Sequence, residues 1–337
     1  MVKVSGSVRV DLLGGTLDLK PINLILPNVL TLNLATSLKA EVEIEKSGND
    51  QLKIISLDYD SEFDYKLSDL SQENFQSDFF GPMNFVCQII NEFSPKEGLM
   101  IKLKSGSPAG AGLGGSSSMG VTLYKALSEY FNKSVDRVSA INTVNDIEAR
   151  ILDSGPAGYQ DYYPALFGGV LALRPNYSKI DVEQLYSDEL VKELESSLTL
   201  VYSGQTRLSG INNWEVYKSF FDKDENVREG LGEIARLTSE AYKAIKEKRF
   251  SDLITLIGKE GEQREKLFSG IVSPEMKSLY QEIKEEVGEL GMKACGAGGG
   301  GCFLLIHSKK NQEKVRTLVI EKGMSVLDFS VDAPVEA

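Results

Sequence analysis

The sequence contains a single histidine, only three cysteines and no long unbroken apolar run. Its longest apolar region, INLILPNVLTLNLA at residues 22–35, is interrupted by proline and asparagine and cannot form a membrane-spanning helix. The first residues, MVKVSGSVRV, lack the apolar core of a signal peptide. The cysteines are odd in number and lack metal-site spacing, which indicates buried thiols in a reducing compartment. We therefore expect a cytoplasmic protein.

Basic residues are fewer than acidic residues. The chain has 37 Lys and Arg against 49 Asp and Glu, a formal net charge of −12. Such a balance argues against nucleic acid or an anionic membrane as a partner. The lone histidine, His307, follows the apolar run FLLI and fits a strand end better than a catalytic base. The expected ligands are therefore small molecules.

The periodicity of apolar residues predicts the secondary structure. Alternation predicts strands over residues 3–13, 35–46, 52–57 and 99–105, and later in FGGVLALRP, LTLVYSG, GCFLLIHS and VLDFSVD. Helical spacing predicts helices over residues 79–94 and 117–152 and several more between 212 and 290. Because strands and helices occur in groups, the fold class is predicted to be α+β. The acidic, proline-containing segment near residues 175–192 suggests two domains, residues 1–185 and 186–337.

A glycine-rich stretch, SPAGAGLGGSSSMGVTLYKAL, leads directly into a helical pattern. Its four clustered glycines are Gly110, Gly112, Gly114 and Gly115. Glycine permits positive φ and close approach of backbone N–H groups to a ligand. The first N–H groups of a helix lack internal partners and attract anions. The serines at 116–118 are suited to cap that helix. The stretch predicts a phosphate-binding loop, with a glycine-rich hairpin or linker as the alternative.

The type of loop can be narrowed from its context. No Gly-Lys-Ser/Thr follows, so it is not a Walker A loop. Gly110, Gly112 and Gly115 satisfy Gly-x-Gly-x-x-Gly, but the preceding LMIKLKS alternates like a half-exposed antiparallel strand. The 25 residues that begin SEYFNKSVDR read as helix, with no second strand. A Rossmann dinucleotide site is therefore excluded.

Four more polar residues stand in patterns that suit a site. In VRVDLLGGTLDL, Arg9 points away from the apolar side of a strand and Asp18 follows a Gly-Gly turn. Glu148 lies at the border of an apolar helical stripe, where a carboxylate needs a partner or a metal. Asp161 occupies a Gly/Pro loop, from which a carboxylate can reach a substrate hydroxyl. Each also has an ordinary interpretation as a surface or turn residue.

A second glycine cluster stands in KACGAGGGGCFLLI, with five glycines in the six positions 296–301. A simple turn needs fewer. Close approach of the backbone to a ligand or to another loop is the better explanation.

Together these stretches resemble the GHMP kinase family, which includes galactokinase, homoserine kinase, mevalonate kinase and phosphomevalonate kinase. The segment PAGAGLGGSS is similar to the family motif Pro-x-x-x-Gly-Leu-Gly-Ser-Ser, with Gly115 in place of the first serine. KACGAGGGGC resembles the C-terminal motif, and YSGQTRLS resembles a second-domain segment of sugar-kinase members. The motifs occur in the family order over nearly the whole chain. The resemblance implies two α+β domains with the active site in the cleft between them.

The resemblance also implies roles for individual residues. The ATP phosphates would be held by Pro108, Gly110, Ala111, Gly112, Leu113, Gly114, Gly115, Ser116, Ser117 and Ser118. Mg²⁺ would be held by Ser116 and Glu148. Asp161 would stand beside the acceptor hydroxyl, with Arg9 next to it as the second catalytic residue. The acceptor would contact Asp18, Gly15, Thr16, Gln160 and Arg207.

The sequence motifs define the identity of the acceptor less closely than the reaction. Galactokinases carry Gly-Glu-His-Thr-Asp where this chain has GGTLD, so the likeness is greater to the heptose-phosphate kinase branch. We expect an ATP- and Mg²⁺-dependent kinase of a sugar or sugar phosphate, acting at the anomeric hydroxyl. A heptose 7-phosphate would need basic residues, for which Arg207 and Lys20 are candidates. The alternatives are a mevalonate-pathway kinase, a galactokinase-like enzyme, and a non-catalytic nucleotide and sugar sensor.

Overall fold

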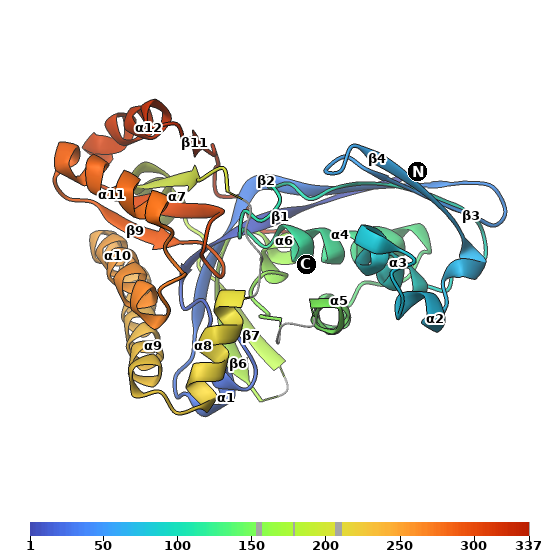
Figure 1. The fold of residues 1–337 in the computed structure, drawn as a ribbon, viewed down its shortest axis with the longest axis horizontal. Coiled ribbons are helices and arrows are strands. Elements are labelled where there is room, and N and C mark those ends of the chain that lie inside the picture. The colour runs from blue at the N-terminus through green and yellow to red at the C-terminus, as the bar shows by residue number, and fades with distance from the viewer. Residues whose placement is uncertain (153–156, 178, 206–210, 337) are drawn as a thin grey trace.

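A long antiparallel pair of strands organises the fold. Strand β1 (Val2–Leu13) pairs with β2 (Thr31–Lys46) along nearly its whole length. The second half of β2 also pairs with β5, and its first half pairs with β6. In Figure 1 this pair runs from the N-terminal sheet toward the C-terminal part of the molecule. The computed structural model describes residues 1–152, 157–177, 179–205 and 211–336.

Within these residues the strands form two sheets. The larger has seven strands in the order β4-β3-β5-β2-β6-β7, with β1 on β2, and the smaller has the order β11-β8-β10-β9. The remaining strands of the larger sheet are β3 (Gln51–Ser56), β4 (Ser61–Lys66), β5 (Leu99–Lys104), β6 (Val170–Asn176) and β7 (Lys179–Gln184). The smaller sheet contains β8 (Leu198–Tyr202), β9 (Gly291–Ala294), β10 (Cys302–Ile306) and β11 (Ser325–Val326).

Helices cover one face of the larger sheet and surround the smaller one (Figure 1). The N-terminal helices are α1 (Ile22–Ile25), α2 (Gln72–Phe75), α3 (Asn84–Asn91), α4 (Gly115–Tyr130), α5 (Arg137–Leu152) and α6 (Tyr163–Phe167). The C-terminal helices are α7 (Asp188–Ser197), α8 (Ile211–Phe221), α9 (Glu225–Lys246), α10 (Phe250–Leu267), α11 (Pro274–Val287) and α12 (Gln312–Glu321). Helix α4 packs against β1 and β2, and α3 and α5 pack against α4.

Strand β1 belongs to two hydrophobic cores. Near its start, Val4 packs in the core beneath α3 and α4. Further along, Val8, Val10 and Leu12 pack with residues of α9, α10, β8 and β10. Polar residues on the opposite side of this second half are therefore buried where the two halves of the molecule meet, and Arg9 is one of them.

The α+β fold and most of the expected strands are confirmed. The expected single helix over 117–152 is wrong: α4 ends near Phe131, and Asn132 has φ +53, which α-helical geometry cannot continue. Of VLDFSVD, only Val326 lies in a strand. Strands β4, β7 and β9 were not expected. The domain boundary near residue 185 stays a prediction, although β7 ends the larger sheet at Gln184.

Candidate active site

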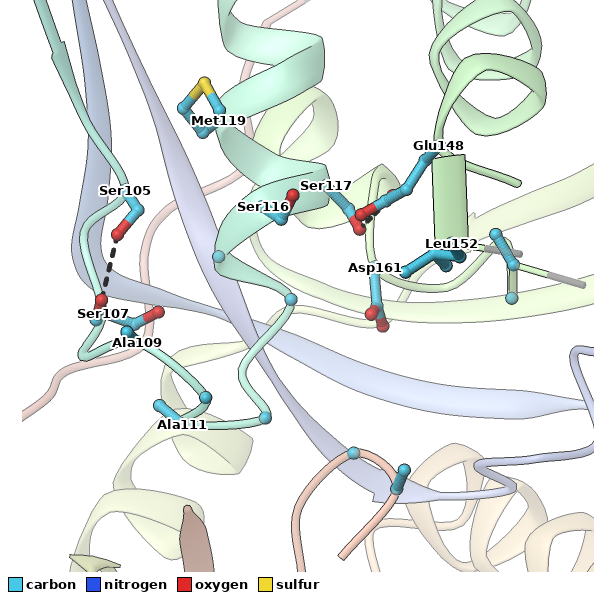
Figure 2. A pocket seen from close by; sticks show the side chains of 18 of the residues that line it. Ser105, Ser107, Ala109, Ala111, Ser116, Ser117, Met119, Glu148, Leu152 and Asp161 are labelled. Atoms are coloured by element: carbon cyan, nitrogen blue, oxygen red, sulfur yellow. Dashed lines mark hydrogen bonds between the residues drawn. The ribbon is translucent and has the colours of Figure 1, made fainter. Parts of the chain in front are cut away.

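A cavity of about 620 Å³ lies between elements from both ends of the chain. The glycine loop and the start of α4 form one side of it, and the turn with Thr16 and Asp18 forms another. Gly296 and Ala297 of the second glycine cluster close it from the C-terminal part, together with Arg264. Figure 2 shows the glycine loop leading into α4, with Glu148 and Asp161 beyond the helix start.

The glycine loop presents unpaired backbone N–H groups to this cavity. Gly110, Gly112 and Gly114 all have positive φ, of 69°, 75° and 71°. Helix α4 begins at Gly115, and its first hydrogen bond runs from the N–H of Ser118 to the carbonyl of Gly114. Among the described residues, the backbone N–H groups from Gly112 to Ser117 donate to no protein acceptor. The loop and helix start therefore suit an anion such as a phosphate chain.

The serines have different roles from the capping expected of them. The N-cap of α4 is Gly114, so residues 116–118 lie inside the first turn. Ser117 donates to Glu148, and Ser118 donates to the carbonyls of Ser7 and Asp161. Ser116 remains exposed on the cavity wall. Of the three serines, Ser117 is the one with a direct hydrogen bond to Glu148, the carboxylate that was expected to hold a metal.

The second glycine cluster supports the first. Gly301 has φ +69, and a Cβ atom there would lie 2.4 Å from the carbonyl oxygen of Gly110. The N–H of Cys302 donates to the carbonyl of Ala111 over 2.7 Å. The close backbone approach expected of this cluster is confirmed. The segment that it approaches is the first glycine-rich loop, at Gly110 and Ala111.

Arg9 joins the glycine loop to Asp161. Its Nε lies 2.8 Å from Oδ1 of Asp161, and a second guanidinium nitrogen lies 2.7 Å from the same oxygen. Its NH1 donates to the carbonyl of Gly112 over 2.5 Å. Arg9 is 2% exposed, whereas the side chain of Asp161 is 27% exposed and faces the cavity. The solvent-facing interpretation of Arg9 is therefore wrong.

Glu148 is a buried carboxylate on α5 that lies beside the start of α4, and it is only 9% exposed. Ser117 donates to its Oε2 over 2.7 Å, and the hydroxyl of Tyr162 donates to the same oxygen. Asn145 in turn donates to the Tyr162 hydroxyl. Burial raises the pKa of Glu148 above its ordinary value, although the hydroxyls of Tyr162, Ser117 and Ser116 counteract it. A cation beside Glu148 would offset the cost of its buried charge.

Asp18 lines the same cavity as Asp161 and lies close enough to feel its charge. The backbone N–H of Gln160 donates to its Oδ2 over 3.2 Å. Burial, aided by the nearby charge of Asp161, raises the pKa of Asp18 to about 7. Among the described residues, the buried Oε1 of Gln160 and Oδ1 of Asn33 accept no hydrogen bond. This corner therefore holds acceptors that suit a ligand with hydroxyl donors.

The structure brings most of the expected site residues to one cavity. On its wall are Pro108, Gly110, Ala111, Gly112, Gly114, Gly115, Ser116, Ser117, Glu148, Asp161, Arg9, Asp18, Thr16 and Gln160. Leu113 and Ser118 are buried behind the wall. Gly15 also lies behind it, against Asp11 and Arg264. Arg207 lies outside the described residues.

Sequence reasoning missed two parts of the cavity. One is an apolar end, formed by Tyr59, Phe85, Met119 and neighbouring side chains, which suits a flat aromatic base. The other is Arg264 on α10. Its signal was its place in the buried stripe of that helix, which runs through Leu253, Ile257, Glu260 and Leu267.

Family models match both halves of the chain. The model for the GHMP kinases N terminal domain matches residues 83–169, and the model for GHMP kinases C terminal matches residues 241–323. The chain belongs to the GHMP kinase family. As a GHMP kinase it is a phosphotransferase with an alcohol group as acceptor, and the two-domain family fold is the one described above.

Individual GHMP kinases are similar over most of the chain. The chain is 26% identical to D-glycero-alpha-D-manno-heptose 7-phosphate kinase of Campylobacter jejuni, covering 98% of this chain and 96% of the relative. It is 26% identical to mevalonate kinase of Saccharolobus solfataricus, covering 84% and 86%. A solved mevalonate kinase structure superimposes with a TM-score of 0.78 at 21% identity, covering 98% and 99%. None of the helices in the described ranges has the length and apolar character of a membrane span.

We predict that Gly112→Val weakens nucleotide binding far more than acceptor binding. The residue has φ +75, which a β-branched side chain disfavours, and its branches would obstruct the approach of a phosphate. Calorimetric titration with ATP measures the effect. Gly232→Val is the matched control, because a Cβ atom there meets nothing within 4 Å. Unchanged nucleotide affinity in a folded Gly112→Val variant would contradict the assignment of the loop.

We predict that Asp18→Asn removes a pH dependence of stability. The folded chain holds the proton of Asp18 up to about pH 7, whereas the unfolded chain releases it near the ordinary carboxyl value. The free energy of unfolding of the wild type therefore falls as pH rises through that window. The variant should be more stable than the wild type above this window and similar below it. Urea denaturation across the window tests this, with exposed Asp222→Asn as control.

Proposed function

We propose that the protein is an ATP- and Mg²⁺-dependent kinase that phosphorylates the anomeric hydroxyl of a sugar or sugar phosphate. One observation carries this proposal. A partly exposed carboxylate, Asp161, is fixed by Arg9 beside a loop of free N–H groups, and Thr16, Asp18 and Gln160 line the same cavity. The similarity to a heptose 7-phosphate kinase over almost the whole chain supports the same acceptor class.

The residues at the start of α4 fit Mg²⁺. Glu148 offers a buried carboxylate and Ser117 a hydroxyl, both oxygen ligands of the kind a hard cation prefers. Within the described residues there is no group of three or more His, Cys, Asp or Glu side chains that could hold a metal. The remaining ligands would be phosphate oxygens and water, as is usual for Mg²⁺. When bound, the metal would neutralise charge on the phosphates.

The chain's own residues would act by position and charge. The N–H groups from Gly112 to Ser117 would hold the phosphates in line with the acceptor. Asp161 would accept the proton of the acceptor hydroxyl as its oxygen bonds to the γ-phosphorus and the bond from that phosphorus to the β-phosphate oxygen breaks. The products are ADP and the phosphorylated acceptor. Arg9 would keep Asp161 oriented and would stabilise developing negative charge.

The acceptor end favours a sugar over mevalonate. Asp18, Gln160 and Thr16 offer carboxylate, amide and hydroxyl groups that match several ring hydroxyls. The mevalonate kinase alternative rests on its 26% identity and on the shared fold. Measuring ADP release with a panel of sugars, sugar phosphates and mevalonate separates these acceptors. Turnover of mevalonate alone would refute the proposal, and turnover of none would favour a non-catalytic sensor.

We predict that Asp161→Asn lowers kcat by at least about 10², the lower end of general-base effects. The amide is nearly isosteric but cannot take the proton, and it no longer pairs with Arg9. Affinity for ATP with Mg²⁺ should change little, because Asp161 faces the acceptor. Steady-state kinetics and nucleotide titration measure both quantities. A variant that keeps more than about a tenth of kcat would remove Asp161 from the mechanism, because that loss is only about 1.4 kcal/mol.

We predict that Glu148→Gln lowers activity at limiting Mg²⁺ and recovers part of it at high Mg²⁺. The amide keeps the shape of the side chain and loses the charge that a hard cation requires. The measurement is the initial rate against Mg²⁺ concentration, with exposed Glu129→Gln on α4 as the matched control. Wild-type activity of Glu148→Gln at limiting Mg²⁺ would show that Glu148 does not bind the metal.

A further inference from the structure

An exposed tryptophan stands on the wall of the cavity. Trp214 lies near the start of α8, is 42% exposed and is the only tryptophan of the chain. Both Trp214 and the preceding Asn213 line the cavity. A large aromatic side chain in water leaves apolar surface unburied, so an apolar partner at this place would be stabilising. The roles given so far to the cavity residues do not account for this indole.

One side of the indole is packed on its own helix. The ring of Tyr217 is stacked on it, with centroids 5.8 Å apart and 17° between the two planes. The two residues are three positions apart and are therefore neighbours on the surface of α8. This stacking holds the plane of the indole in place. Trp214 therefore meets the cavity with its remaining surface, in an orientation that is set before a ligand binds.

The packing of α8 indicates which end of the cavity Trp214 occupies. Val216 and Phe220 of α8 are buried and belong to the same hydrophobic core as Leu17. Leu17 stands between Thr16 and Asp18, which line the acceptor side of the cavity. Helix α1 contributes to this core as well, and α8 lies beside α1 in Figure 1. The apolar end of the cavity is built on the N-terminal core instead. The tryptophan thus belongs to the acceptor end.

We propose that Trp214 is a specificity residue for the acceptor, and that its indole stacks on the C–H face of a sugar ring. This inference rests on the proposed kinase function and adds the residue that selects a cyclic substrate. A sugar ring presents C–H groups on its faces and hydroxyls around its edge. The face of an indole carries partial negative charge, so it attracts such C–H groups while the contact removes apolar area from water.

The proposal divides the recognition of the acceptor between the two halves of the molecule. Asp18 and Gln160 from the N-terminal half would bind hydroxyls at the edge of the ring, and Trp214 from the C-terminal half would cover its face. Asn213 offers an amide beside the indole for a further hydroxyl. An open-chain acceptor such as mevalonate has no flat face to stack, so this wall disfavours it.

The test compares D-glycero-D-manno-heptose 7-phosphate with its reduced alditol, which keeps the hydroxyls and the phosphate but cannot close a ring. Because Trp214 is the only tryptophan, its fluorescence in the full-length protein reports binding without nucleotide or turnover. We expect the sugar to change this fluorescence and the alditol to bind about tenfold more weakly, the order expected for one aromatic contact. ATP with Mg²⁺ alone should change the signal little.

Two substitutions separate stacking from a structural role. Trp214→Ala should raise KM for the heptose phosphate about tenfold and leave kcat within about threefold, because the stacking is equal in the ground and transition states. Calorimetric titration of this variant should no longer distinguish the sugar from the alditol. Trp214→Phe keeps an aromatic face and should recover most of the loss. Tyr177→Ala, which removes an exposed aromatic residue away from the cavity wall, is the control and should change neither constant.

Several results would overturn the inference and leave the kinase proposal intact. They are unchanged fluorescence at saturating heptose phosphate, equal affinity of the wild type for sugar and alditol, or an unchanged KM in Trp214→Ala. A signal that follows ATP, or protein concentration alone, would also overturn it, by assigning the indole to the nucleotide or to a second copy of the chain. The fluorescence measurements need only the wild type, so they decide the question if Trp214→Ala does not fold. Phosphoryl transfer to none of the acceptors would refute the proposed function, and the fluorescence would still decide whether Trp214 contacts a sugar.

Discussion

The arrangement of the site depends on one buried guanidinium. Arg9 contacts Asp161 through two nitrogens and the carbonyl of Gly112 through a third, so one side chain fixes the distance between the carboxylate and the glycine loop. A buried charge without its partner is strongly unfavourable, which means that neither contact can be lost cheaply. The strand that carries Arg9 packs into both hydrophobic cores. Strand β1 therefore connects the packing of the two halves of the molecule to the positions of Arg9 and Asp161.

The C-terminal half of the molecule also makes buried ionic contacts with β1. The cluster of Asp11, Lys293 and Glu260 joins β1 to α10 and β9 by contacts that are closed to water. The loop after β9 then returns to support the first glycine loop at Gly110 and Ala111. The two glycine clusters are thus in direct contact, and the backbone of the first approaches Gly301 too closely for a side chain there. Burial meanwhile raises the pKa values of Glu148 and Asp18, so a cation or hydrogen-bond donors would be needed to stabilise the charged form of either carboxyl.

Much of this site could be predicted from the sequence, because its signals are local. Glycines before a helical stripe indicate a loop of free N–H groups, and Glu148 stands out as a carboxylate on an apolar border. Other parts depend on tertiary contacts. The hydrogen bond between Ser117 and Glu148 requires α5 to pack on α4, which local sequence does not reveal. The role of Gly15 is to make room for Asp11 and Arg264, which a turn motif does not reveal. Arg264 reads as one charge among many on α10 until β9 is placed against that helix.

The central claim is that this geometry transfers a phosphoryl group to an anomeric hydroxyl beside Asp161. The most direct measurement is phosphorus–proton correlation NMR of the product formed from ATP, Mg²⁺ and heptose 7-phosphate, with ADP quantified in the same sample. The account predicts a new phosphate coupled to the anomeric proton, formed in equal amount to ADP, and absent with Asp161→Asn over the same period. A phosphate on any other position, or ADP formed at the same rate without acceptor, would contradict it.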